Sequence, residues 1–276
     1  MTSIKADLHM HTNYSDGRLT PKQLIELSKK NGITTISITD HDNVSGVEEA
    51  INFGNEVGVQ VIPGVEISAD IDEQEVHILG YFMDFRNKKF LDFLSASREL
   101  RIKRNEKIVE KLNTMGSSIS FDAILIKAGE NASIGRPHIA MELNEEGFVN
   151  SYYDAFTKYI GDGKPAFVRK PNPKSEKVIN TISESGGLSF IAHPGKLVRD
   201  ELLMRLIQEG LDGIEVIHPS HTKDDIEYFN KTAAEYFLLT SGGSDFHGGM
   251  KNDGKNFGKY FVSMNEVLNM KRRLFN

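Results

Sequence analysis

The stretch ADLHMHTNYSDG, residues 6–17, joins a short apolar segment to a turn and carries three residues of types that bind metal ions. His9 and His11 are separated by one residue, and Asp16 precedes a glycine, as is typical of a turn. In an extended strand, residues i and i+2 point to the same face, so both histidines can reach one ion. The same letters also fit an ordinary strand that runs into an Asp-Gly turn, and both interpretations stay open for this segment alone.

Similar apolar segments recur along the 276 residues and alternate with amphipathic ones. The segment PKQLIELSKKNG, residues 21–32, starts with proline and ends with glycine, which predicts a helix with both of its ends marked. Repeated strand–helix units predict an α/β protein with a parallel sheet, either open or closed into a barrel, and about seven strands favour the barrel. The predicted strands cover residues 4–9, 34–38, 59–67, 75–81, 187–192, 213–217 and 237–241.

Residues 89–163 interrupt this alternation, because they read as mostly helical and contain no clear strand pattern. We therefore expect residues 1–88 and 164–276 to form the main domain. Residues 89–163 are expected to form an inserted helical cap subdomain between two of its strands.

Composition excludes several classes of protein and of site. A net charge of -6 argues against a globally basic nucleic-acid binder, although a local basic groove is still compatible with it. The chain has no cysteine, so disulfides and thiolate ligands are excluded and any metal must be held by His, Asp and Glu. No apolar segment approaches the length of a membrane span and the N-terminus lacks a signal-like apolar region. We expect a cytoplasmic protein with no membrane contact and no obligate protein partner.

Histidines and carboxylates gather where the predicted strands end. Seven of the nine histidines lie at such ends or late within strands: His9, His11, His41, His77, His193, His218 and His247. The acidic residues with the same placement are Asp16, Asp40, Asp42, Glu66 and Asp245. Strand ends and the loops after them converge on one face in parallel α/β folds, and mixed imidazole and carboxylate ligands suit Mn, Fe or Zn.

Six motifs, in order between residues 7 and 248, carry a family resemblance: DLHMHTNYSDG, ITDHDNVSG, GVEIS, EVHILGY, IAHPG and GSDFHG. They resemble the PHP family, the polymerase and histidinol phosphatase group of phosphoesterases. The resemblance implies a distorted (β/α)7 barrel with a trinuclear metal site. The insertion, with GRPHIA and GDGKPAFV, resembles a stand-alone branch that acts on nucleoside 3′,5′-bisphosphates and on short RNA from its 5′ end.

The resemblance also implies a ligand set for three divalent ions (Mn, Fe or Zn, with Mn favoured). One ion is assigned to His9, His11, Glu66 and Asp245. Glu66 would bridge to a second ion completed by His77 and His193, and a third would be held by Asp16, His41 and His247. These nine residues are the expected catalytic set, and a metal-bridging hydroxide is expected to attack phosphorus.

The expected substrate is a small phosphorylated molecule, a nucleotide or short RNA. The resemblance implies a second phosphate site remote from the metals, and the candidates are Arg136, Arg101, Arg104, Lys164, His218 and His221. Arg101 and Arg104 belong to a basic run at residues 98–107, which could equally be the solvated face of a helix. His218 could instead support the ligands, and His138 could simply pack beneath Arg136.

Three further aspartates, Asp7, Asp40 and Asp42, are expected to orient ligands or cap helices rather than to bind metal.

Two other functions compete with the nucleotide phosphoesterase. A histidinol-phosphate phosphatase would need an acidic pocket for the amine of its substrate. A non-catalytic metal-binding module would commonly have lost some of the ligands, and none of the nine is replaced here.

Overall fold

A computed structural model describes residues 5–275, so Ile4 of the first predicted strand lies outside the described residues. The strands are β1 (Lys5–Met10), β2 (Ile33–Ile38), β3 (Gln60–Ile71), β4 (Gln74–Tyr81), β5 (Leu188–Ile191), β6 (Gly213–Ile217), β7 (Leu239–Gly242) and β8 (Val262–Ser263). The helices of the barrel are α1 (Pro21–Lys30), α2 (Val47–Val57), α7 (Ser175–Glu184), α8 (Asp200–Gln208), α9 (Lys223–Glu235), the 3-10 turn η2 (Asp253–Lys255) and α10 (Met264–Phe275). The remaining helices are α3 (Lys88–Thr114), α4 (Phe121–Ala128), α5 (Arg136–Glu145), α6 (Tyr152–Ala155) and the π-helical turn η1 (Phe156–Ile160).

All eight strands belong to one sheet, in the order β7-β6-β5-β4-β3-β2-β1-β8. The sheet nearly closes into a barrel, because the segment after β7 returns to β1. There the Asp245 amide donates to the His9 carbonyl and the His11 amide donates to the Phe246 carbonyl, both at 2.9 Å. The predicted α/β barrel is therefore confirmed.

The sheet is not parallel throughout, and in this respect the sequence-based expectation was wrong. β4 runs antiparallel to both β3 and β5, and the unpredicted β8 runs antiparallel to β1. Only Asp72 and Glu73 separate β3 from β4. A connection of that length closes a hairpin, whereas a parallel pair needs a crossover of a dozen or more residues.

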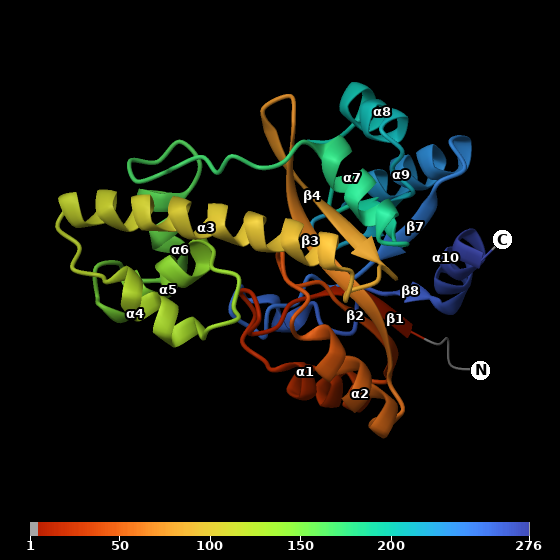
Figure 1. Cartoon of the computed structure of the whole chain (residues 1–276), viewed down its shortest axis with the longest axis horizontal. Helices are drawn as coiled ribbons and strands as arrows, with labels where there is room; N and C mark the ends of the chain where they lie inside the picture. The colour runs from red at the N-terminus through yellow and green to blue at the C-terminus, as the bar shows by residue number, and fades with distance from the viewer. Residues whose placement is uncertain (1–4, 276) are drawn as a thin grey trace.

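Local sequence accounts for the helices that cover the barrel, as α1 illustrates. Thr20 caps α1 by accepting from the Gln23 amide, Pro21 occupies the first turn, and the chain leaves the helix through Gly32 at a φ of 72°. Figure 1 shows α1 and α2 on one side of the barrel and α7, α8, α9 and α10 around the opposite side. The predicted helix at residues 21–32 is confirmed.

The strand period places polar and apolar residues of β1 on opposite faces. Leu8 belongs to a core cluster that includes Met270 of α10, and Met10 belongs to one that includes Leu24 of α1. His9 and His11 alternate with them, so burial of the apolar residues turns both histidines to the other face of the strand.

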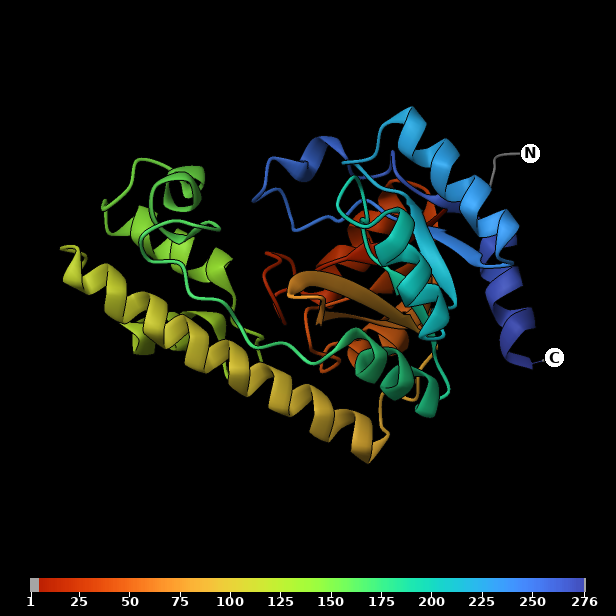
Figure 2. The ribbon, with the colours of Figure 1, turned by 90° about the horizontal axis from the view of Figure 1, so that it is seen from above.

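The helices from α3 to η1 project from one side of the barrel, and residues 161–174 run back to α7 (Figures 1 and 2). The first half of α3 packs on the barrel core through Phe90 and Leu94. Its second half contributes Ile108 and Leu112 to a separate core shared with α4 and α5. Within residues 5–275, no helix combines the length and the apolarity that crossing a membrane would require.

Candidate metal centre and adjoining cavity

Glu66 of β3 lies at the centre of the histidine cluster with a side chain that is only 1% exposed. Its Oε1 lies 2.8 Å from His77 Nδ1 and 2.9 Å from His193 Nε2. Burial disfavours the carboxylate, but attraction by His41 and His77 outweighs burial and holds the pKa of Glu66 well below its ordinary value. A carboxylate that is ionised between histidine rings on both sides can bridge two cations.

The other oxygen of Glu66 faces three more histidines. Oε2 lies 3.1 Å from His41 Nδ1, 3.3 Å from His11 Nε2 and 3.4 Å from His9 Nε2. Asp245, on the loop after β7, approaches the same pair from β1, with Oδ1 3.2 Å from His11 Nε2 and 3.4 Å from His9 Nε2. The two H-x-H histidines therefore point together toward a carboxylate on each side, as the alternation of β1 predicts.

Asp16 forms a second carboxylate centre at the mouth of the barrel. Its Oδ1 lies 3.3 Å from His247 Nε2 and 3.8 Å from both His41 Nε2 and His11 Nδ1. Thr12 and Ser15 hold the turn that carries Asp16, because both donate hydrogen bonds to Asp40 of the loop after β2. The turn and the ligand interpretations of this aspartate are thus compatible.

The buried nitrogen and oxygen atoms at these carboxylate centres fit a metal cluster. Six of them have no hydrogen-bond partner: His9 Nε2, His11 Nε2, Asp16 Oδ1, His41 Nδ1, Glu66 Oε2 and His77 Nδ1. Buried polar atoms without partners are costly, and a shared set of cations would satisfy all six. Four groupings have ligand atoms close enough for one ion, namely His11–Asp16–His41–His247, His9–Glu66–His193, His9–His11–Asp245 and His41–Glu66–His77.

These groupings contain all nine predicted ligands but divide them differently from the sequence-based assignment. His77 and His193, which were assigned to one ion, fall in separate groupings on either side of Glu66. Four residues, His9, His11, His41 and Glu66, each belong to two groupings. The residues are brought together, and their distribution among ions stays a prediction.

The structure adds a positioning residue that sequence reasoning missed, Glu215 of β6. It is fully buried, and its Oε1 lies 2.8 Å from His9 Nδ1 while its Oε2 accepts from the His193 amide at 2.6 Å. The three aspartates expected to support the ligands do not hydrogen-bond to histidine rings: Asp40 accepts from Thr12 and Ser15. Asp7 accepts from the Ser244 amide at 3.0 Å, and Asp42 accepts from Arg101 of α3.

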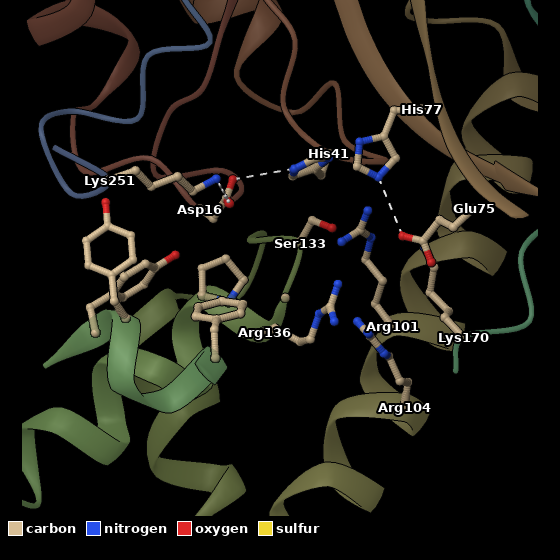
Figure 3. Close-up of a pocket in the computed structure, with 15 residues that line it drawn as sticks. Asp16, His41, Glu75, His77, Arg101, Arg104, Ser133, Arg136, Lys170 and Lys251 are labelled. Carbon is tan, nitrogen blue, oxygen red and sulfur yellow. Dashed lines mark hydrogen bonds and ion pairs between the residues drawn. The ribbon is translucent and has the colours of Figure 1, made fainter. Parts of the chain in front are cut away.

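A cavity of about 510 Å³ opens between the histidine cluster and helices α3, α5 and α6 (Figure 3). Asp16, His41 and His77 lie along one wall, and Arg101, Arg104 and Arg136 lie along the facing wall. The cationic residues that line the cavity outnumber the acidic ones. The acidic residues are Asp16 and Glu75, and the cationic residues are Arg101, Arg104, Arg136, Lys170 and Lys251. The cavity is therefore suited to an anion that also reaches the metals.

The three arginines that line the cavity differ in whether a carboxylate already neutralises their charge. Arg101 donates to Asp42 and to Ser68 Oγ, and Arg136 pairs with Asp162 at 2.6 Å. Arg104 donates its Nε to the Val168 carbonyl at 2.8 Å and, among residues 5–275, has no carboxylate partner. Burial, reinforced by the neighbouring Arg136, lowers the pKa of Arg104 to about 10, which leaves it charged at neutral pH.

Lys170 was not predicted from the sequence, because it lies alone in the segment that returns from the cap. Its side chain is 3% exposed, and its Nζ lies 3.5 Å from Asp42 Oδ2. Burial, with repulsion from Arg101, lowers the pKa of Lys170 to about 8.

The other three predicted substrate residues do not line this cavity. Lys164 is exposed in the turn after η1. His221 uses both ring nitrogens, since Nδ1 lies 2.9 Å from the Val216 carbonyl and Nε2 accepts from the Gly195 amide at 3.1 Å. His218 is buried beside the centre, with Nε2 3.4 Å from Asp245 Oδ2 and Nδ1 2.7 Å from Ser220 Oγ. His138 caps α5 by accepting from the Gly135 amide, which accounts for its burial.

Comparisons with known proteins agree on one family. The family model of the PHP domain matches residues 7–186. A 5′-3′ exoribonuclease of Haemophilus influenzae is 36% identical over 88% of this chain and 90% of its own length. A 3′,5′-nucleoside bisphosphate phosphatase of Chromobacterium violaceum is 33% identical over 87% of this chain and 86% of its own length. The solved structure of a protein from Bifidobacterium adolescentis, proposed to be a metal-dependent phosphoesterase, superposes with a TM-score of 0.91 at 33% identity, covering 97% of this chain and 96% of that one.

Proposed function

This chain belongs to the PHP domain family and is a metal-dependent phosphoesterase, and from that premise we propose that its substrate carries a second phosphate remote from the scissile one. The substrate class is a nucleoside 3′,5′-bisphosphate or the 5′ end of a short RNA. The relatives named for these two activities, at 33% and 36% identity, support this class.

The metal centre would consist of the nine His, Asp and Glu residues, with Glu66 between the ions. We propose three divalent ions of Mn, Fe or Zn, because these metals suit mixed imidazole and carboxylate ligands, and we keep Mn as the favoured one. Such ions lower the pKa of bound water and neutralise the oxygens of the phosphoryl group. His9, His11 and Asp245 would hold an ion rather than touch the substrate, and ions held by Asp16, His41 and His77 of the cavity wall would lie within reach of the scissile phosphate.

One observation carries the second-phosphate proposal, namely the guanidinium of Arg104 across the cavity from the metal centre (Figure 3). It has no carboxylate partner among the described residues, and its Nε is fixed by the Val168 carbonyl. A guanidinium that is positioned but not neutralised binds phosphate with charge-assisted hydrogen bonds. Lys170 and Arg136 would add positive potential on the same wall.

The balance of charge in the cavity disfavours histidinol phosphate as the substrate. That substrate presents an amine, and the acidic residue that could receive it, Glu75, already lies 3.5 Å from His77 and accepts from Asn172 at 3.1 Å. A non-catalytic module is disfavoured by the convergence of all nine ligands in one cluster.

The test compares Arg104→Met with Lys103→Met, which removes an exposed charge from the neighbouring position of α3. Metal-reconstituted proteins would be assayed with a nucleoside 3′,5′-bisphosphate, a 5′-phosphorylated oligoribonucleotide, histidinol phosphate and p-nitrophenyl phosphate. We expect Arg104→Met to lower kcat/KM for the bisphosphate roughly 10- to 100-fold, the range of a lost charge-assisted hydrogen bond. Activity on p-nitrophenyl phosphate, which has a single phosphate, should change less than about twofold.

Equal losses on both substrates would remove Arg104 from a remote-phosphate site. A preference of the wild-type protein for histidinol phosphate over the bisphosphate and the oligoribonucleotide would overturn the substrate class itself.

A further inference from the structure

Lys251 reaches the metal centre from the loop between His247 and η2, outside every motif of the sequence. Its Nζ lies 3.1 Å from Asp16 Oδ2 and 2.7 Å from His247 Nε2. Figure 3 shows the amino group beside Asp16 at the edge of the cavity. Lys251 thus hydrogen-bonds to two of the four residues in the His11–Asp16–His41–His247 grouping.

The contact with His247 uses the ring nitrogen that an ion would need. His247 Nδ1 lies 2.7 Å from the Asp245 carbonyl, so this nitrogen donates its proton there and Nε2 holds the free lone pair. The ammonium of Lys251 donates to that lone pair. A divalent ion binds an imidazole nitrogen through the same lone pair at about 2 Å. Lys251 and an ion therefore cannot occupy His247 together.

Asp16 is divided between the lysine and the grouping. Oδ2 accepts from Lys251, whereas Oδ1 is buried without a hydrogen-bond partner and faces His11, His41 and His247. An ion that used Oδ1 together with His247 Nε2 would have to displace the lysine from His247. The stem of lysine is flexible, and Gly248 and Gly249, with φ values of 79° and 88°, link His247 to the loop that carries Lys251.

The remaining carboxylates of the centre have no such competitor. Among the described residues, Glu66 and Asp245 pair with histidines and with neither lysine nor arginine. Cationic competition is thus confined to one side of the cluster.

We propose that Lys251 competes with a divalent ion for Asp16 and His247, so that this grouping fills last and most weakly. The inference rests on the proposed metal centre. While this position is empty, the ammonium neutralises Asp16 and keeps the mouth of the barrel ordered. When an ion enters, the ammonium is released into the cavity that the substrate occupies.

The experiment measures metal binding without substrate or turnover. Wild-type protein, Lys251→Met and Lys255→Met would be stripped with chelator, titrated with Mn²⁺ or Zn²⁺ by calorimetry, and counted for bound metal by mass spectrometry. Lys255 is the matched control, since it is an exposed lysine of the same loop region. We expect Lys251→Met to tighten the weakest ion at least about tenfold, because a cation in direct contact with the ligands is removed. The tighter ions should change less than about threefold, and Lys255→Met should match the wild type.

Unchanged affinity of the weakest ion in Lys251→Met, or the same tightening of every ion, would overturn the competition. Failure of the proposed metal centre gives a different result, because wild-type protein and both variants would then bind no stoichiometric ion.

Discussion

Glu215 controls two histidines at once through its two carboxylate oxygens. Oε1 lies beside His9 Nδ1, and Oε2 accepts the backbone N–H of His193. Burial opposes the charge, but the neighbouring His9 outweighs burial and lowers the pKa of Glu215, so the carboxylate is ionised. Its acceptor oxygen keeps the proton of His9 on Nδ1. Nε2 is thereby left as the ligand atom, which is the usual arrangement of a metal-binding histidine.

Glu215→Gln should therefore lower metal affinity although the side chain keeps its shape. A glutamine has one acceptor oxygen and must present its N–H₂ group to one of two donors. Facing His9, the amide moves the ring proton to Nε2 and blocks the ligand atom; facing the His193 amide, it breaks that contact. We expect metal affinity to fall roughly 10- to 100-fold, measured as bound metal after dialysis against buffered ion concentrations.

Glu209→Gln is the control, since Glu209 is a partly exposed carboxylate that accepts from Ser175 outside the centre. The same metal content in both variants would mean that Glu215 does not set the orientation of His9.

The sequence points to nine candidate ligands but not to the residues that act on them. His9, His11 and Asp16 stand within one short stretch, and the strand-end pattern together with the family resemblance singles out the other six. Glu215, Lys170 and Lys251 come from separate elements and belong to no motif, although Lys251 follows His247 by only four residues. The barrel brings Glu215 to His9, and residues 161–174 bring Lys170 to Asp42, so local patterns could not indicate these two.

At the scale of elements, the β3–β4 hairpin decides how the ligands are presented. β3 continues four residues beyond the predicted end at Ile67, and Asp72 and Glu73 form a tight turn at φ values of 46° and 64°. The short gap was the available signal of antiparallel pairing, and the underestimated length of β3 concealed it. Antiparallel pairing sets Ser68 opposite His77, which brings His77 beside Glu66.

The closing contact between β1 and the segment after β7 depends on a glycine. A Cβ on Gly243 would lie 2.4 Å from the His9 amide nitrogen and 2.7 Å from Asp7 Oδ1. Gly243→Ala must therefore push the loop of Asp245 away from β1. We expect the free energy of unfolding of the metal-free protein to fall by about 1–3 kcal/mol, as in overpacked cores, with a parallel loss of metal binding. Urea denaturation and metal counting provide the measurements.

Gly254→Ala is the matched control, because a Cβ there meets no atom within 4 Å and should change stability by less than about 0.5 kcal/mol. Equal urea midpoints for the two variants would show that the close approach at Gly243 is not needed for closure.

At the scale of the whole molecule, α3 joins the barrel to the cap. Its two halves pack into different cores, and between them Arg98 and Arg101 reach the loop after β2. We propose that residues 89–163 act as a cap over the main domain formed by residues 1–88 and 164–276. The first half of α3 serves in this arrangement as a rigid arm on the barrel.

Asp42 is the point where cap and barrel are coupled electrostatically. Arg101 of α3 donates to its carboxylate, and Lys170 of the return segment lies 3.5 Å away. Burial opposes the charged form, but Arg101 and Lys170 outweigh it and lower the pKa of Asp42 to about 2. Because the folded-state pKa lies below the unfolded value near 3.8, the contribution to stability is complete above that value and is lost as pH falls toward 2.

A double-mutant cycle of Asp42→Asn and Arg101→Met should give a coupling free energy of about 3 kcal/mol at pH 7, because breaking a buried pair leaves an uncompensated charge. The reference is the Arg86–Glu48 pair, whose side chains are 69% and 57% exposed and whose coupling should stay below about 1 kcal/mol. Urea denaturation of the metal-free proteins measures both cycles. Couplings of equal size would mean that the buried pair adds no special link between cap and barrel. A larger coupling at Asp42 that disappears on acidification would instead establish that one ionised carboxylate, next to the candidate ligand His41, holds Arg101 in the wall opposite the proposed metal centre.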